Sequence, residues 1–148
     1  MVAATGIAAV RPAQAVLGGD VSSIDADRAR LSGSTMRPLT LRAGQAAGHE
    51  IRMADGSSIR EYVAPNGVVY AVAWSTRFKP DLTALLGRHA PSYAAAATEA
   101  LKSPGLKRAI VLQRDDLVVQ SRSHLNSFVG KAYVRALVPA GVDVDELR

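Results

Sequence analysis

Residues 60–74 read Arg-Glu-Tyr-Val-Ala-Pro-Asn-Gly-Val-Val-Tyr-Ala-Val-Ala-Trp, and this stretch decides the fold. Two runs rich in β-branched and aromatic residues flank Pro65-Asn66-Gly67, a pattern that predicts a β-hairpin. Pro65 suits the second position of a type I turn, Asn66 the third, and Gly67 the left-handed position that closes a three-residue loop. A two-residue turn on Asn66-Gly67 is the alternative, but Pro65 has no N–H for a ladder pair.

The three-residue loop predicts that Tyr62 lies opposite Tyr70 and that Arg60 lies opposite Val72. One face of the hairpin then carries Arg60, Tyr62, Ala64, Val68, Tyr70, Val72 and Trp74. The other face is smaller, so a helix can approach it closely; it carries Ile59, Glu61, Val63, Val69, Ala71 and Ala73. The aromatic face is either a second layer of core or a ligand-binding platform made of Arg60, Tyr62, Tyr70 and Trp74, with Arg60 stacking or pairing with an anion.

Glu61 is the one acidic side chain on the smaller face. A buried carboxylate needs a partner, because desolvation penalises its charge. We therefore predict a structural ion pair with an arginine such as Arg88 or Arg108, rather than a catalytic acid.

The rest of the chain predicts a single α+β domain over residues 16–148, an antiparallel sheet of hairpins with helices on one face. Of the 148 residues, 48% are hydrophobic, which is enough for one core. Further strands are expected at 46–53, 107–113, 117–121 and 132–137, with a weak edge strand around 39–41. Helices are expected at 22–31, 80–89 and 92–102, with Pro91 interrupting the last two, and a helical turn at 143–148.

The first 15 residues resemble the apolar part and cleavage site of a secretory signal peptide. Residues 2–10 are small and apolar, and Ala13-Gln14-Ala15 fits the small-x-small cleavage rule. No Lys or Arg precedes the apolar run, so we expect the true start codon to lie upstream. The sequence thus predicts a periplasmic or secreted product cleaved after Ala15; a disordered Ala-rich tail is the alternative. No segment is apolar enough to span a bilayer.

No pattern of residues predicts a metal or cofactor site. There are no cysteines, and His49, His89 and His124 have no ligand partner at metal spacing. Asp115-Asp116 falls in an expected turn, where aspartates bond their own backbone. A small hydrolase that pairs His124 with Ser121 or Ser123 is an alternative, although the chain lacks a Gly-x-Ser-x-Gly elbow and a phosphate-binding glycine loop.

The net charge of +5 comes from 18 basic and 13 acidic residues, and the arginines are dispersed. Dispersed charge is typical of a solvated surface. Binding of an anionic polymer or nucleic acid through these arginines is a second alternative, with nucleic acid the less favoured partner.

The hairpin, followed by Pro80-Asp81-Leu82 and Leu85-Leu86-Gly87, resembles the bacterial family catalogued as "domain of unknown function 2844". Further matches cover the expected mature chain: Leu17-Gly18-Gly19, Asp116-Leu117-Val118-Val119, Ser123-His124, Gly130-Lys131-Ala132-Tyr133-Val134, Gly141-Val142 and Glu146-Leu147-Arg148. The resemblance implies a small proteobacterial protein with an export signal, and it implies no activity, cofactor or catalytic residue.

The sequence therefore favours an exported, non-enzymatic binding or accessory protein. Its partner would be an envelope component or another protein, bound by the aromatic hairpin face or a sheet edge. The basis is an extensive strand and aromatic surface without a convergent cluster of titratable groups.

Overall fold

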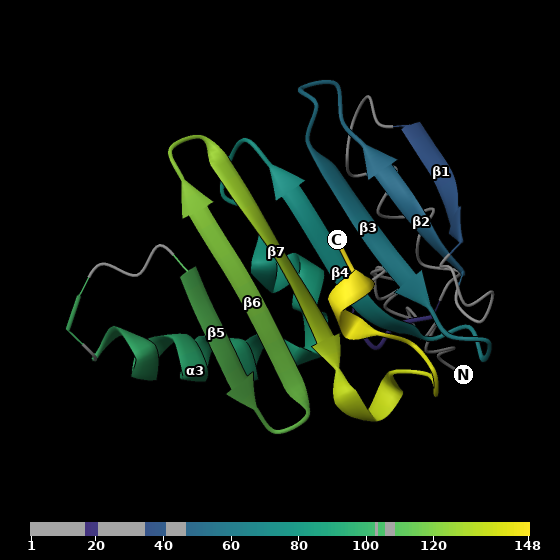
Figure 1. The fold of residues 1–148 in the computed structure, drawn as a ribbon. Coiled ribbons are helices and arrows are strands. Elements are labelled where there is room, and N and C mark those ends of the chain that lie inside the picture. Colours follow the sequence, from purple (N-terminus) through teal and green to yellow (C-terminus); the bar gives the residue numbers. More distant parts are fainter. Residues whose placement is uncertain (1–16, 21–34, 41–46, 103, 106–108) are drawn as a thin grey trace, which may run out of the picture.

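The computed structural model of the chain describes residues 17–20, 35–40, 47–102, 104–105 and 109–148. Its centre is a seven-stranded antiparallel sheet of order β1-β2-β3-β4-β7-β6-β5 (Figure 1). The strands are β1 (Thr35–Thr40), β2 (Ala47–Arg52), β3 (Ser58–Val63), β4 (Val69–Thr76), β5 (Ala109–Arg114), β6 (Leu117–His124) and β7 (Ser127–Val134). The predicted α+β class with an antiparallel sheet is confirmed, whereas the expected helix at 22–31 lies outside the described residues.

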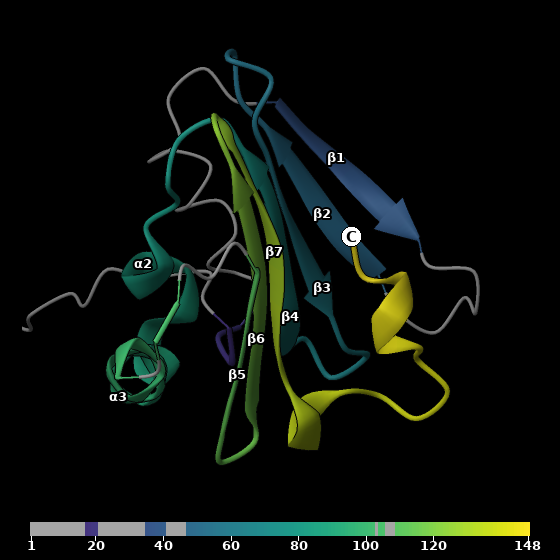
Figure 2. The ribbon, with the colours of Figure 1, turned by 60° about the vertical axis from the view of Figure 1, so that its left-hand side comes forward.

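Two helices, α2 (Leu82–Leu86) and α3 (Ala90–Leu101), lie against one face of the sheet, which we call the helix face (Figure 2). Asp81 caps α2, because its carboxylate accepts a hydrogen bond of 3.0 Å from the Ala84 N–H. The 3₁₀ turn Gly87–His89 links the helices. Pro91 lies in the first turn of α3, where no N–H partner is needed, so it starts this helix instead of interrupting one.

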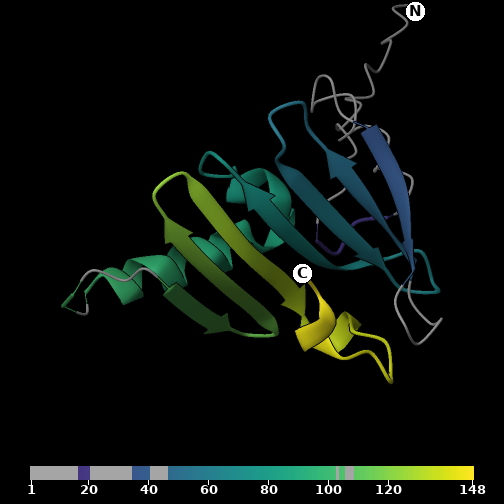
Figure 3. The ribbon, with the colours of Figure 1, turned by 45° about the horizontal axis from the view of Figure 1, so that its top comes forward.

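The last segment of the chain crosses the opposite face of the sheet (Figures 2 and 3). It follows the 3₁₀ turn Arg135–Leu137 and includes a second 3₁₀ turn, Val144–Glu146. We call residues 138–148 the strap and the surface that it crosses the strap face. Leu147 of the strap is 2% exposed and packs in a cluster with Tyr62, Tyr70, Ala71, Ala73, Val118 and Tyr133. Buried core residues therefore lie on both faces of the sheet.

The loop of the central hairpin contains Pro65, Asn66 and Gly67. The Ala64 N–H donates to the Val68 carbonyl at 2.9 Å, and the Gly67 N–H donates to the Ala64 carbonyl at 2.9 Å. Gly67 has a φ of 83°, the left-handed conformation that glycine adopts at least cost. The loop fixes the first pair beyond it, Val63 opposite Val69.

Further from the loop, the predicted register is wrong by one residue. The pairing shifts between Val63 and Tyr62, so that Tyr62 lies opposite Ala71 and Arg60 opposite Ala73. Tyr70 is the extra residue of β4 in this bulge. Because side chains alternate between faces, one extra residue transfers every later side chain of β4 to the other face.

The bulge corrects the predicted composition of both faces. Val72 and Trp74, expected beside the tyrosines, join the core of the helix face with Ile59, Leu85 and Leu86. Ala71 and Ala73, expected beneath the helices, lie on the strap face instead. The large side chains thus fill the space under the helices, and the small ones allow the strap to approach the sheet.

The hairpin of β6 and β7 was not anticipated in full. Strands were expected at 117–121 and 132–137, but β6 continues to His124 and β7 starts at Ser127. The connecting turn, Leu125-Asn126, contains neither Gly nor Pro, and Leu125 adopts a φ of 49° that leucine rarely takes. The usual sequence signal of a hairpin turn is absent there.

Gly130 of β7 faces Trp74 across the strand pair, and a side chain has no room at this position. A Cβ atom would lie 2.4 Å from both the Trp74 ring and the Gln120 main-chain oxygen. We predict that Gly130→Ala lowers the free energy of unfolding by about 1–3 kcal/mol, measured by urea denaturation. The control is Val129→Ala, a truncation of a neighbouring side chain that is 46% exposed, for which less than about 1 kcal/mol is expected. Equal losses in the two variants would contradict the packing argument.

Candidate functional site

The strap face carries a groove beside the end of the strap. Its volume is about 580 Å³, and it crosses β3, β4, β7, β6 and β5. Directly opposite residues on neighbouring strands share a face, and this rule places the groove side chains in two rows. One row is Arg60, Ala73, Lys131, Gln120 and Val111; the other is Ser58, Ser75, Val129, Arg122 and Ala109.

Cationic side chains dominate the charge of this groove. Arg60, Arg122, Lys131 and Arg148 line it, and no Asp or Glu is among its described lining residues. Arg122 is exposed and forms no ion pair with any described residue. These four basic residues come from four separate segments of the chain, and the fold brings them together in one groove.

The strap is held by side chains of the sheet that contact its main chain. The Tyr62 hydroxyl donates to the Arg148 carbonyl at 3.0 Å and accepts from the Arg148 N–H at 3.2 Å. The Arg60 guanidinium donates to the same carbonyl. Lys131 donates to the Val144 carbonyl at 2.6 Å, and its ammonium lies 3.6 Å from the Asp145 carboxylate. Most of these bonds would form with any strap sequence.

Glu50 of β2 orients Arg60 toward the strap. The two side chains form an ion pair of 2.8 Å, and Arg52 lies 3.3 Å from the other oxygen of the same carboxylate. Burial acts to raise the pKa of Glu50, but the hydrogen bonds and positive charges of Arg60 and Arg52 outweigh it and lower the pKa below its usual value. Glu50 therefore stays ionised and keeps the guanidinium of Arg60 in place.

The four residues of the predicted aromatic platform do not form one surface. Tyr62 and Tyr70 share the strap face, with ring centroids 6.3 Å apart, but they are 3% and 0% exposed. Arg60 lies beside them and lines the groove. Trp74 is 3% exposed, and its side chain lies in the helix-face core. The bulge at Tyr70 separates Trp74 from the other three.

Tyr70 has an unusual environment for a phenol. Within the described part of the chain, its hydroxyl has no hydrogen-bond partner, although it is fully buried. Burial, with a smaller contribution from Tyr62, raises the pKa of Tyr70 to about 12. A buried hydroxyl without a hydrogen-bond partner lowers the stability of the fold. A phenylalanine at position 70 would therefore be at least as stable as the tyrosine.

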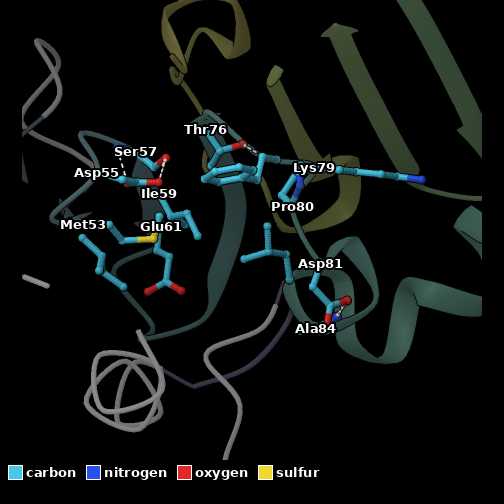
Figure 4. A pocket seen from close by; sticks show the side chains of 13 residues that line it. Met53, Asp55, Ser57, Ile59, Glu61, Thr76, Lys79, Pro80, Asp81 and Ala84 are labelled. Carbon is cyan, nitrogen blue, oxygen red and sulfur yellow. Dashed lines mark hydrogen bonds between the residues drawn. The ribbon is translucent and has the colours of Figure 1, made fainter. Parts of the chain in front are cut away.

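A second hollow, of about 230 Å³, lies on the helix face near the start of α2 (Figure 4). Its apolar wall includes Ile51, Met53, Ile59, Phe78, Pro80, Ala84 and Leu85. The polar groups at its rim bond one another: Asp55 accepts from the Ser57 N–H at 2.8 Å, and the Thr76 hydroxyl donates to the Phe78 carbonyl at 2.7 Å. These groups are already satisfied, so this pocket offers mainly apolar contact.

Glu61 borders the same pocket, beside Met53 and Ile59 in Figure 4, and is fully buried. The expectation that Arg88 pairs with it is wrong. Arg88 lies instead against Gly18, where a Cβ would be 2.7 Å from its guanidinium, and its Nε donates to His89 at 3.4 Å. Arg108, the other expected partner, lies outside the described residues.

The structure does not bring together the groups of the hydrolase alternative. His124 and Ser123 are adjacent on β6, and adjacent strand residues point to opposite faces. Ser121 lies on the same face as Ser123, and no described hydrogen bond joins either hydroxyl to His124.

Among the described residues, no three His, Cys, Asp or Glu side chains cluster as metal ligands would. Asp115 and Asp116 form the β5–β6 turn, with Asp115 at a φ of 53°.

Comparison with protein families identifies a match over residues 13–147, nearly the whole chain, with the family described as "Protein of unknown function (DUF2844)". The chain belongs to this family. Neither curated proteins nor solved structures gave a match. No helix of the described residues is long and apolar enough to cross a membrane. For this DUF2844 protein, the groove and the strap are therefore the basis for a functional proposal.

The two buried tyrosines allow a matched test of the strap contact. We predict that Tyr62→Phe lowers the free energy of unfolding by about 1 kcal/mol, because it removes both hydrogen bonds to Arg148. Tyr70→Phe should leave this free energy unchanged or raise it, because it removes an unsatisfied hydroxyl. Urea denaturation of both variants measures the difference. An equal loss in the two variants would show that the Tyr62 bonds add no stability.

Proposed function

We propose that this protein is an exported, non-enzymatic binding module and that its ligand site is the groove on the strap face. The observation that carries the proposal is the lining of the groove: four cationic side chains, from β3, β6, β7 and the strap, with no carboxylate among the described lining residues. An open groove of this kind suits an extended ligand, since its length crosses five strands.

The charge of the groove favours an anionic ligand. Lys131 and Arg60 already bond carbonyl oxygens of the strap, while Arg122 is exposed and its guanidinium forms no ion pair with a described residue. Guanidinium groups bind carboxylates, sulfates and phosphates in a bidentate manner. The proposal therefore includes the alternative of an anionic-polymer binder, and it assigns the binding site of the polymer to the groove. Arg60, from the aromatic platform, retains its suggested role as an anion-binding residue, while the tyrosines support the strap.

Arg122 provides the sharpest test, because its removal breaks no ion pair among the described residues. We expect Arg122→Ala to weaken binding of a heparin octasaccharide about 3- to 10-fold, with a smaller dependence of the binding constant on salt concentration. Isothermal titration calorimetry at several salt concentrations measures both quantities.

The matched control is Arg114→Ala, which removes the same charge from the end of β5, on the helix face. Its heparin affinity should stay close to that of the wild type. Equal weakening by the two substitutions would mean that net charge, rather than the groove, attracts the polymer.

Export is the second part of the proposal. The predicted signal residues, 1–15, lie outside the described part of the chain. The residues just after them support cleavage there: Leu17 is fully buried, and the Gly18 N–H donates to the Val69 carbonyl at 2.7 Å. A chain beginning at Val16 would keep these contacts.

We predict that the protein, expressed with its upstream in-frame codons, is found in the periplasm or the medium with Val16 as its first residue. Cell fractionation and mass spectrometry of the intact protein measure this. A control with Ala13 and Ala15 changed to Asp should remain uncleaved, because small residues are required at these positions. A cytoplasmic product that retains residues 1–15 would refute export and leave the groove proposal unaffected.

A further inference from the structure

We propose that the natural ligand of the groove is an acidic, extended polypeptide segment, and that the strap occupies part of its binding surface as a built-in substitute. This inference rests on the proposed groove function and specifies its partner. It follows from three properties of the strap: how its main chain is held, which side chains it carries, and how it adjoins the groove.

The strap is recognised as a peptide would be. Tyr62 bonds both the N–H and the carbonyl of Arg148, while Arg60 and Lys131 donate to strap carbonyls. These contacts need only a main chain in the right position, so another chain could make them. A sugar polymer or a nucleic acid offers no peptide N–H for the Tyr62 hydroxyl to accept.

The strap also has the charge and apolar pattern that complement this face. Residues 143–147 read Asp-Val-Asp-Glu-Leu, three carboxylates among five residues. The Asp145 carboxylate lies 3.6 Å from the Lys131 ammonium, whose side chain is only 13% exposed. Leu147 packs against the tyrosines and alanines of the strap face and is 2% exposed. A ligand with carboxylates around one apolar anchor would satisfy the same groups.

The groove is continuous with the bound strap. Leu147 and Arg148 belong to its lining, so the open part of the groove adjoins these two residues. Beyond them lie Arg122, Gln120 and Ser75, which provide further donors for carboxylates and carbonyls. A longer acidic segment that displaced residues 144–148 would therefore gain contacts that the strap does not make.

A labelled peptide with the sequence of residues 139–148 tests the inference by fluorescence anisotropy. Its matched control replaces Asp143, Asp145 and Glu146 by Asn, Asn and Gln. The receptors are the full chain and its variant Leu147→Ala, in which the strap loses its apolar anchor. We expect the variant to bind the acidic peptide at least tenfold more tightly than the wild type, because a larger fraction of its sites is free. The neutral peptide should bind at least tenfold more weakly than the acidic one.

If Leu147→Ala does not fold, as judged by circular dichroism, Val144→Ala serves as a second loosened receptor, because Val144 belongs to the strap and packs against the same cluster. Absence of peptide binding to a folded, loosened variant would overturn the inference, and so would equal affinity for the acidic and neutral peptides. If heparin binding remains sensitive to Arg122→Ala in that case, the groove function stands and only the polypeptide partner is wrong. If heparin binding is also insensitive to Arg122→Ala, the proposed function fails as well.

Discussion

One extra residue in β4 sets the arrangement of the rest of the molecule. The loop at Pro65-Asn66-Gly67 pairs Val63 with Val69, and the bulge at Tyr70 then moves the register by one residue. Beyond it, the bulky Val72 and Trp74 face the helices, and the small Ala71 and Ala73 face the strap. A regular hairpin would place alanines beneath the helices and a tryptophan beneath the strap. Both layers of core would then have to be packed differently.

The strap face combines structural support with recognition chemistry. Small residues in the sheet allow the main chain of the strap to lie close enough for Tyr62, Arg60 and Lys131 to reach its carbonyls. The same side chains form one end of a basic groove. Glu50 stabilises the orientation of Arg60, and Arg52 bonds the other oxygen of the same carboxylate. A binding surface can thus use contacts that the fold already maintains.

Much of the architecture could be predicted because its signals are local. Proline, asparagine and glycine specify the central loop, and the flanking runs rich in β-branched and aromatic residues specify β3 and β4. Prediction was less accurate where the cause is not local. The β6–β7 turn has no Gly or Pro, so the strands around Leu125 were assigned too short. Pairing of β4 with β7, across some fifty intervening residues, leaves no pattern in the sequence.

The sequence by itself determined the α+β class, the hairpin loop, the family and the identity of Arg60 as a residue beside two tyrosines. Each of these depends on neighbouring residues, whose conformational preferences act over one turn or one strand. Only the tertiary structure decided that the tyrosines are covered, that Trp74 lies on the other face, and that Arg60, Arg122, Lys131 and Arg148 line one groove. The physical reason is that strand order, a bulge and the path of the strap bring together residues far apart in the chain, and contacts over that distance depend on packing rather than on local preference.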